Sequence, residues 1–469
     1  MGAGGSYGIL PAVGFPFDAR AAAAFADEAA VARHDAAVWG LRAKRDAAAA
    51  AVPDFEALRE RAAAVKDHAL DHLDVYLERF EANAQAAGAQ VHWAEDAAAL
   101  RAIASGLLAE RGITRVVKSK SMLTEECGLN PHLEAHGVEV VDTDLGERIV
   151  QLGAEPPSHI IVPAIHRTRA QVGALFHHQL GTPAGESDPE RLMAHARRDL
   201  RRRFLDAQAA ISGVNFAIAD TGSLVIVTNE GNADLGTSLA PLHIAALGIE
   251  KVVPTLDDAA VLLRLLARSA TGQPISAYTS VLTGPRPGGE LHVVLVDNGR
   301  SRLLASPRHR RALRCIRCGA CLNTCPVYRR AGGHAYATAV GGPIGAVLAP
   351  AHGRDAASRE LPYASSLCGS CTAVCPVRID LHAQLLAWRS EAPALPSGLA
   401  RAARAAAALL ARPRLHRAAG RAVRIGWPLL RRIGARGPAA AWLAARELPP
   451  HPGASFRELW KRRPRERPR

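Results

Sequence analysis

The sequence contains no run of about 18 uncharged apolar residues, so we expect no helix that crosses a lipid bilayer. Its first residues lack a basic segment followed by an apolar one, so we expect no signal peptide. Disorder is excluded because 48% of the 469 residues are hydrophobic. The composition therefore predicts a globular chain of about two to four domains, with a cytoplasmic location.

Lysine is scarce: only six of the 58 basic residues are lysine, and the formal net charge is +14. Such an excess first suggests nucleic acid or an anionic membrane surface as a partner. The segment 401–469, however, holds 18 of the basic and three of the 44 acidic residues, a net charge of +15, which leaves −1 for the rest. The folded body is therefore electrically neutral, and the basic charge belongs to the C-terminal segment.

That C-terminal segment has the pattern of a docking helix. A basic face is formed by three arginines at helical spacing: Arg417, Arg421 and Arg424. Arg431 and Arg432 extend this face if the helix continues past Pro428. We expect Pro428 to kink or break the helix. Three tryptophans supply apolar anchors: Trp427, Trp442 and Trp460. We expect this segment to dock on an acidic partner subunit or on an anionic membrane at its inner face, with a merely solvated tail as the alternative.

Strands and helices alternate in the middle of the chain. β-rich runs occur at 114–117, 138–141, 159–162, 214–219, 223–228, 251–253 and 291–296. Helical patterns occur at 19–110, 189–212 and 257–270. This alternation predicts an α/β domain with a largely parallel sheet. We expect four parts: a helical extension (1–55), the α/β domain (56–305), a cysteine-rich domain (306–392) and an Arg/Ala-rich helical tail (393–469).

Seven of the eight cysteines lie between Cys315 and Cys375, which indicates a metal site and not a disulfide framework. The first motif has the spacing C-x-x-C-x-x-C-x-x-x-C-P and comprises Cys315, Cys318, Cys321 and Cys325. This is the ligand run of bacterial iron–sulfur proteins, in which three thiolates bind one 4Fe-4S cluster and the fourth binds another. A zinc site or an inert structural role is the alternative.

The second motif comprises Cys368, Cys371 and Cys375, and aligning the two Cys-Pro pairs places Ser365 where a fourth cysteine would stand. If the motifs exchange their last ligand, cluster 1 is held by Cys315, Cys318, Cys321 and Cys375, and cluster 2 by Cys325, Cys368 and Cys371. Cluster 2 is then a 3Fe-4S cluster, or a 4Fe-4S cluster with an open or non-cysteine ligand. Ser365 is either an oxygen ligand or an ordinary capping or solvated serine.

Two adjacent clusters form a path for single electrons, as in ferredoxins. Four arginines flank the first motif: Arg314, Arg317, Arg329 and Arg330. They either raise the reduction potential and dock an electron-transfer partner, or are solvated side chains. A different class of function is an iron–sulfur regulator that binds nucleic acid through the basic tail, but no helix-turn-helix or zinc-finger pattern accompanies the charge.

The α/β region carries five segments that resemble the LUD domain: VKSKSM (117–122), TDLGE (143–147), PAIH (163–166), ADTGS (219–223) and TNEGN (228–232). With the cysteine motifs and SFRELW (455–460) behind them, the order resembles the lactate utilization protein B family. That family also has a three-cysteine second motif, so Ser365 is no departure from it.

This resemblance implies an iron–sulfur electron-transfer subunit of a multi-protein system that oxidises L-lactate to pyruvate and allows growth on lactate. It implies two partners: a cysteine-rich subunit similar to heterodisulfide-reductase components, and a second LUD-domain protein. It also implies a fold similar to the sugar-phosphate isomerase and CoA-transferase group. A self-sufficient dehydrogenase is disfavoured, because no flavin or nicotinamide signature is visible and no G-x-G-x-x-G follows a strand.

A ligand pocket for an anion such as a carboxylate is a further hypothesis, with structural turns as the alternative. Its candidate residues follow strands of the α/β domain: Lys118, Lys120, Ser223, Glu230 and Asn232. We expect His166, His177 and His178 to be hydrogen-bonded histidines and not metal ligands. Cys127, far from both motifs, is expected to be a small buried side chain.

Overall fold

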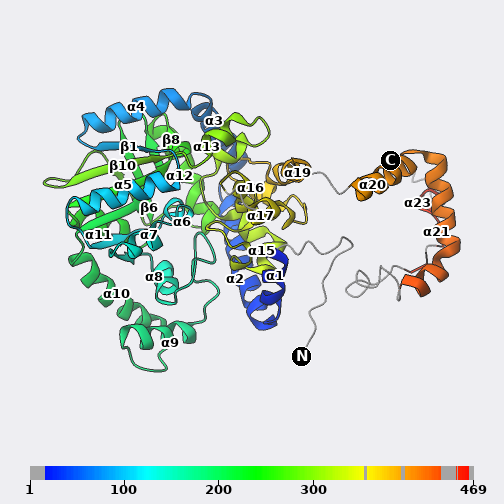
Figure 1. Ribbon diagram of the computed structural model, residues 1–469, viewed down its shortest axis with the longest axis horizontal. Helices are drawn as coiled ribbons and strands as arrows, with labels where there is room; N and C mark the ends of the chain where they lie inside the picture. The colour runs from blue at the N-terminus through cyan, green and yellow to red at the C-terminus, as the bar shows by residue number, and fades with distance from the viewer. Residues whose placement is uncertain (1–15, 353–355, 392–396, 435–449, 452, 464–469) are drawn as a thin grey trace. The chain divides into compact units, whose positions relative to one another are not determined.

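The computed structural model describes residues 16–352, 356–391, 397–434, 450–451 and 453–463 (Figure 1). Residues 16–391 form one compact unit, and the described residues from 397 onward belong to a second unit. The limits expected for four domains remain a prediction. No helix within the described ranges has the length and apolar character that a bilayer span requires.

The centre of the first unit is a six-stranded sheet in the order β1-β10-β7-β4-β2-β3, in which all neighbours are parallel. Its strands are β1 (Gln90–Ala94), β10 (Glu290–Val296), β7 (Leu242–Gly248), β4 (Ala209–Gly213), β2 (Arg115–Lys118) and β3 (Glu139–Asp142). Both faces are covered, because Val294 and Val296 pack with α5 (Ala97–Ala109) while Val293 and Leu295 pack with α4 (Leu73–Ala86). Parallel sheets are normally buried on both faces in this way.

A second sheet of four strands has the order β8-β5-β6-β9. Its strands are β8 (Val252–Val253), β5 (Phe216–Ile218), β6 (Ser223–Thr228) and β9 (Tyr278–Leu282). The β5–β6 and β6–β9 pairs are antiparallel. Gly222, at φ +65° in the β5–β6 turn, lies so close to α4 that a Cβ there would stand 2.2 Å from the Ala84 nitrogen. The turn therefore requires glycine on two counts, conformation and space.

The remaining helices of this unit surround the sheets or carry the cysteines (Figure 1). Those before the cysteines are α1 (Pro16–Phe25), α2 (Glu28–Ala50), α3 (Phe55–Asp71), α6 (Met122–Glu126), α7 (Leu129–Ala135), α8 (Leu145–Leu152), α9 (Arg169–Leu180), α10 (Pro189–Leu205), α11 (Asn232–Leu239), η1 (Ile249–Lys251), α12 (Leu256–Ala270) and α13 (Arg300–Ala305). Those of the cysteine region are η2 (Arg310–Arg314), α14 (Ala320–Thr324), α15 (Pro326–Ala331), η3 (His334–Tyr336), α16 (Gly342–His352), α17 (Ala356–Glu360), η4 (Leu361–Tyr363), α18 (Ser370–Val374) and α19 (Leu381–Glu391).

The N-terminal helices are part of this unit and pack on the cysteine region. Phe17 of α1 and Val38 of α2 share one apolar core with the cysteines of both motifs. The Arg45 guanidinium donates to the Val374 carbonyl at 3.2 Å. In Figure 1, α1 and α2 accordingly run beside α15.

The largely parallel sheet is confirmed, but several predicted elements are wrong. Residues 159–162 form a bend and not a strand, because His159 Nδ1 accepts the Ile161 N–H at 3.0 Å and so replaces a ladder partner. The predicted helix 189–212 ends at Leu205, and its last residues form β4 between β2 and β7. The helical run 19–110 is interrupted by the strand β1.

The described part of the second unit is helical, with α20 (Ser397–Ala411), α21 (Pro413–Gly434) and α23 (Phe456–Arg462). α21 continues through Pro428, so the break that was one of the two expected effects is wrong, and the kink stays a prediction. Arg424 of α21 pairs with Glu458 of α23 at 2.8 Å. Trp442 lies outside the described residues.

Candidate metal centre and the neighbouring cavity

The two cysteine motifs have the same backbone. Arg317 and Leu367 both adopt positive φ, at 60° and 56°, one residue before Cys318 and Cys368. Glycines follow these two cysteines at φ 76° and 79° and lead into α14 and α18. Because positive φ is costly for arginine and leucine, the repetition shows that both loops are held to one shape.

Ser365 occupies the position of the missing cysteine within that shape. The Arg317 N–H donates to Cys315 Sγ at 3.4 Å, and the Leu367 N–H donates to Ser365 Oγ at 3.1 Å. The serine hydroxyl thus accepts the same loop hydrogen bond as the thiol of the first motif. It does not cap a helix, because α18 begins after Gly369.

The cysteines gather into two neighbouring groups. Burial raises the pKa of Cys318, and the nearby Cys375 and Cys315 raise it further. In the other group, burial raises the pKa of Cys371 to about 12, with contributions from Cys325 and Cys368. Cys375 therefore lies with the first motif and Cys325 with the second, as ligand exchange requires. The assignment of ligands to individual clusters remains a prediction.

The surroundings of the thiols fit iron–sulfur clusters. Except for Cys315, half-buried, and Cys368, exposed, the cysteines of both motifs are buried, and all are free of disulfides. Backbone N–H groups point at sulfur, as from Ile379 to Cys375 Sγ at 3.3 Å. Such donors stabilise thiolates, most strongly where the sulfur is buried. Within the described ranges, no group of three His, Cys, Asp or Glu side chains is placed to bind a single metal ion. The ligands of an iron–sulfur cluster do not have to meet at one point, because each thiolate binds a different iron atom.

Buried cations lie close to the first motif. Lys66 is buried and donates to the Glu250 carbonyl, and burial and Lys251 lower its pKa to about 8. The Lys251 ammonium donates to the Cys315 carbonyl at 3.4 Å. On the other side, the Arg59 guanidinium donates to the Cys375 carbonyl at 3.0 Å. This positive environment favours thiolates and the negative charge of a reduced cluster.

The arginines that flank the first motif have three different roles. Arg314 and Arg329 are neutralised by Asp67 at 2.6 Å and Asp35 at 2.7 Å. Arg330 is exposed. Arg317 is 15% exposed, and its Nη1 atom is buried with no hydrogen-bond partner.

Arg317 lines a cavity of about 350 Å³ at the carboxyl ends of β2, β4 and β7. This edge of a parallel sheet is the usual ligand position in α/β folds. Three predicted pocket residues line the cavity: Lys120, Glu230 and Asn232. Lys120 pairs with Asp144 at 2.7 Å, and burial and the nearby Asp144 raise the pKa of Glu230.

The other two predicted pocket residues do not line this cavity. Ser223 hydrogen-bonds to Thr283 at 2.6 Å, at the opposite end of β6 from Glu230. Two residues that the sequence did not single out also line it, Lys251 and Arg300. Arg317, predicted only as an arginine that flanks the first motif, lines it too. Because lysine is scarce in this chain, Lys251 could have been noticed as a candidate cavity residue. Its place at the end of the sheet depends on β7, the strand before it, which the sequence pattern did not predict.

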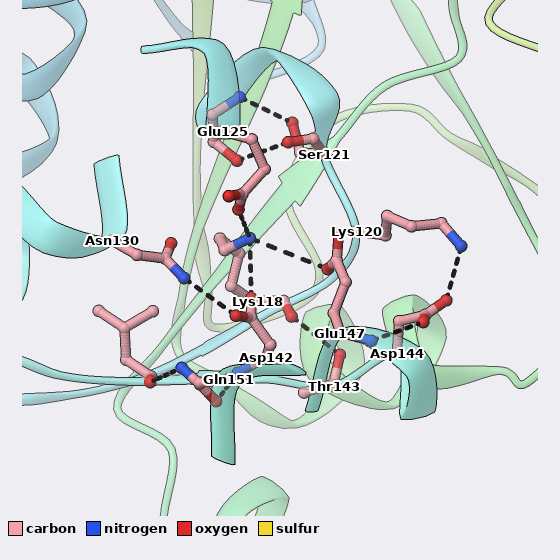
Figure 2. A network of polar contacts seen from close by, with 12 residues as sticks. Lys118, Lys120, Ser121, Glu125, Asn130, Asp142, Thr143, Asp144, Glu147 and Gln151 are labelled. Carbon is pink, nitrogen blue, oxygen red and sulfur yellow. Dashed lines mark hydrogen bonds and ion pairs between the residues drawn. The ribbon is translucent and has the colours of Figure 1, made fainter. Parts of the chain in front are cut away.

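Lys118 is fully buried in a network of carboxylates (Figure 2). Its ammonium lies 2.8 Å from Asp142 Oδ1, 2.9 Å from Glu125 Oε1 and 4.0 Å from Glu147 Oε2. Burial opposes the charge, but the carboxylates outweigh it and raise the pKa of Lys118 well above its usual value. Burial also raises the pKa of Glu147 to about 8. Lys118 therefore stabilises the edge of the sheet and is not exposed to a ligand.

Two of the three histidines and the isolated cysteine agree with expectation. His166 pairs with Glu155 at 2.9 Å, and His177 bonds to the Thr182 carbonyl. Cys127 is buried, and burial raises the pKa of its thiol to about 12, which makes it unreactive.

Comparison with known proteins agrees with this architecture. Residues 77–303 match the LUD domain, and residues 311–379 match the 4Fe-4S dicluster domain. Lactate utilization protein B of Geobacillus thermodenitrificans is 48% identical over 342 residues, which cover 71% of each chain. The chain belongs to the lactate utilization protein B family. The member from Bacillus velezensis is 46% identical over 358 residues, 75% of each chain.

A further relative is an electron transport protein, YkgF of Escherichia coli, described as uncharacterized. It is 41% identical over 429 residues, covering 87% of this chain and 88% of its own. A solved DUF162 family protein from Deinococcus radiodurans aligns with 48% of this chain at 14% identity and a TM-score of 0.27, too low to bear on the fold. The family and the dicluster match confirm the predicted cofactors: the segment from Cys315 to Cys375 carries iron–sulfur clusters.

Replacing Ser365 by cysteine is expected to give cluster 2 a fourth thiolate, because the side chain already accepts the loop N–H in the required position. If cluster 2 of the wild type has three irons, Ser365→Cys raises the iron content by about one per chain and abolishes the 3Fe-4S electron paramagnetic resonance signal. If it has four, the content stays the same and the reduced spectrum of cluster 2 changes. Ser366→Cys, one residue away, is the matched control and should change neither.

Proposed function

We propose that this protein is the iron–sulfur electron-transfer subunit of a multi-protein system that oxidises L-lactate to pyruvate and so allows growth on lactate. The observation that supports this most is the pair of adjacent cysteine groups, with five of the seven thiols buried, in a chain whose relatives are named lactate utilization protein B. The clusters, when bound, supply single-electron transfer.

The residues of this chain prepare that site. The buried thiols lie in an apolar core with α1 and α2, which excludes water. Backbone N–H groups of the two loops donate to sulfur, and Arg59 and Lys251 fix the carbonyls of Cys375 and Cys315. A site held in one geometry changes little between redox states, and this keeps the cost of moving an electron low.

The growth test uses a strain that lacks the gene and carries it on a plasmid. We expect wild type, but not Cys315→Ala or Cys325→Ala, to restore growth on L-lactate, while all strains grow equally on pyruvate. Equal growth of the deletion strain on both carbon sources would refute the proposal.

The proposed partners are a cysteine-rich subunit similar to heterodisulfide-reductase components and a second LUD-domain protein. The proposal also includes a LUD fold similar to the sugar-phosphate isomerase and CoA-transferase group.

The basic face of α21 with Arg417, Arg421 and Arg424 suits an acidic surface of one of the two proposed partner subunits. We expect both to copurify with the full chain, and a chain that ends at residue 396 to lose at least one. Unchanged copurification and membrane association would exclude docking through this segment.

A further inference from the structure

The cavity at the edge of the parallel sheet adjoins the first cysteine motif. Its wall is formed by residues that follow β2, β4 and β7, by the end of β6 and by α12. The cysteine loop contributes Arg317, and η1 contributes Lys251, which bonds to the Cys315 carbonyl. A volume of about 350 Å³ admits a small organic molecule together with ordered water.

The charges in this cavity are not balanced. Lys120 is matched by Asp144 at 2.7 Å, and Arg300 by Glu250 at 2.6 Å. Arg317 is matched only loosely, because Glu126 Oε2 lies 4.0 Å from its Nη2 and is held more closely by Arg300, at 3.3 Å. Its buried Nη1 has no hydrogen-bond partner. A buried guanidinium with an unused donor is costly unless an acceptor occupies the space beside it.

At the same end of the cavity, the Lys251 ammonium has more hydrogen-bond donors than nearby acceptors. The hydrogen bond of its ammonium to the Cys315 carbonyl is long, at 3.4 Å, and a lysine carries three donors. The adjacent Glu250 is engaged by Arg300. One end of the cavity therefore presents a planar arginine fork, which can pair with both oxygens of a carboxylate, and an ammonium, which adds a second positive charge.

We propose that the cavity binds a short 2-hydroxy or 2-oxo monocarboxylate, with its carboxylate on Arg317 and Lys251. The unmatched cations and the cavity carry the carboxylate site, and the class of acid rests on the proposed function. Because Arg317 lies between Cys315 and Cys318 in the chain, the bound anion offsets positive charge beside cluster 1. Binding therefore lowers the reduction potential of that cluster, since an added negative charge opposes reduction.

The experiment titrates the full, iron-loaded chain with L-lactate and with pyruvate in a calorimeter. Lactamide, which has the size of lactate without its charge, and inorganic phosphate are the comparison ligands. We expect at least one of the two acids to bind, lactamide and phosphate to bind at least about tenfold more weakly, and the potential of cluster 1 to fall on binding. Arg317→Gln and Lys251→Met should each weaken binding about tenfold or more, as expected for the loss of a charged hydrogen bond.

Arg330→Gln is the matched control, because it removes the same charge from an exposed arginine of the same region and should bind as wild type does. If Arg317→Gln loses iron, its weaker binding could reflect damage to the cysteine loop. Lys251→Met, which lies on η1 outside that loop, then tests whether the cation itself is needed for binding. The proposal is overturned if neither acid binds, if lactamide or phosphate binds as tightly as the acids, or if binding survives both substitutions together. If neither acid binds but growth on lactate still requires the gene, this inference alone is refuted. If an acid binds but growth on lactate does not require the gene, the proposed function alone is refuted.

Discussion

Cys315→Ala and Cys325→Ala should each remove one iron–sulfur cluster and leave the other in place, although both residues belong to the first motif. Wild type is expected to hold about seven to eight irons per chain after anaerobic reconstitution, and each variant about half of that. The physical reason is the grouping of the thiols: Cys375 raises the pKa of Cys318, whereas Cys325 raises that of Cys371. Iron analysis and electron paramagnetic resonance of the reduced protein measure the losses.

The decisive comparison crosses the two motifs. Cys375→Ala should reproduce the spectrum of Cys315→Ala, and Cys368→Ala that of Cys325→Ala, because the exchanged ligands pair residues from opposite motifs. Cys127→Ala, a buried cysteine outside both groups, is the control and should retain all iron. Identical spectra from Cys315→Ala and Cys325→Ala would refute ligand exchange. A preparation that contains only zinc, without broad visible absorption, would refute the clusters altogether.

Lys118→Met should cost about 3–5 kcal/mol in free energy of unfolding, the effect expected when one member of a buried ion network is removed. The substitution keeps the length and apolar stem of the side chain but leaves Asp142 and Glu125 without their cation (Figure 2). Urea unfolding of the iron-loaded chain at pH 6, followed by circular dichroism, measures the difference. Stability within 1 kcal/mol of wild type, roughly the value of a surface pair, would contradict the network's structural role.

Glu147→Gln is the control for that experiment, because it alters the same network without leaving a charge unpaired. The pKa of Glu147 is raised from 4.5 to about 8, so at pH 6 the folded protein already carries a neutral carboxyl there. The folded state holds a proton that the unfolded state has lost, so wild-type stability falls as the pH rises from 4.5 through 8. Glu147→Gln should match wild type below about pH 4.5, lack this particular decline, and therefore exceed wild type in stability at pH 6.

The sequence predicted the metal site better than the cavity. Iron ligation follows from spacing within short segments, and Ser365 was found by aligning two such segments. The cavity joins Lys251 to Arg317 through tertiary packing, which no local pattern encodes. Lys118 and Lys120 look equivalent in sequence, but β2 ends at Lys118, which is buried in an ion network, while Lys120 reaches the cavity.

The errors in the fold have a similar cause. β4 reads as the end of a helix because it is rich in alanine, and only its place between β2 and β7 makes it a strand. Residues 159–162 read as a strand because they are apolar, but His159 takes over their backbone hydrogen bonding and binds Asn323 of α14 at 2.9 Å. In both cases partners distant in sequence override local preference.

The contact between Arg59 and Cys375 has a consequence for biosynthesis. The two residues are 316 positions apart, and the guanidinium of the first bonds to the carbonyl of the second. A ribosome therefore releases the N-terminal helices long before the chain segment that completes their core exists. The predicted ligand exchange gives each cysteine group a residue of the second motif, so neither cluster can be completed before that motif has been made. We therefore expect iron insertion to follow synthesis of Cys375, and the apolar sides of α1 and α2 to lack their partner until then.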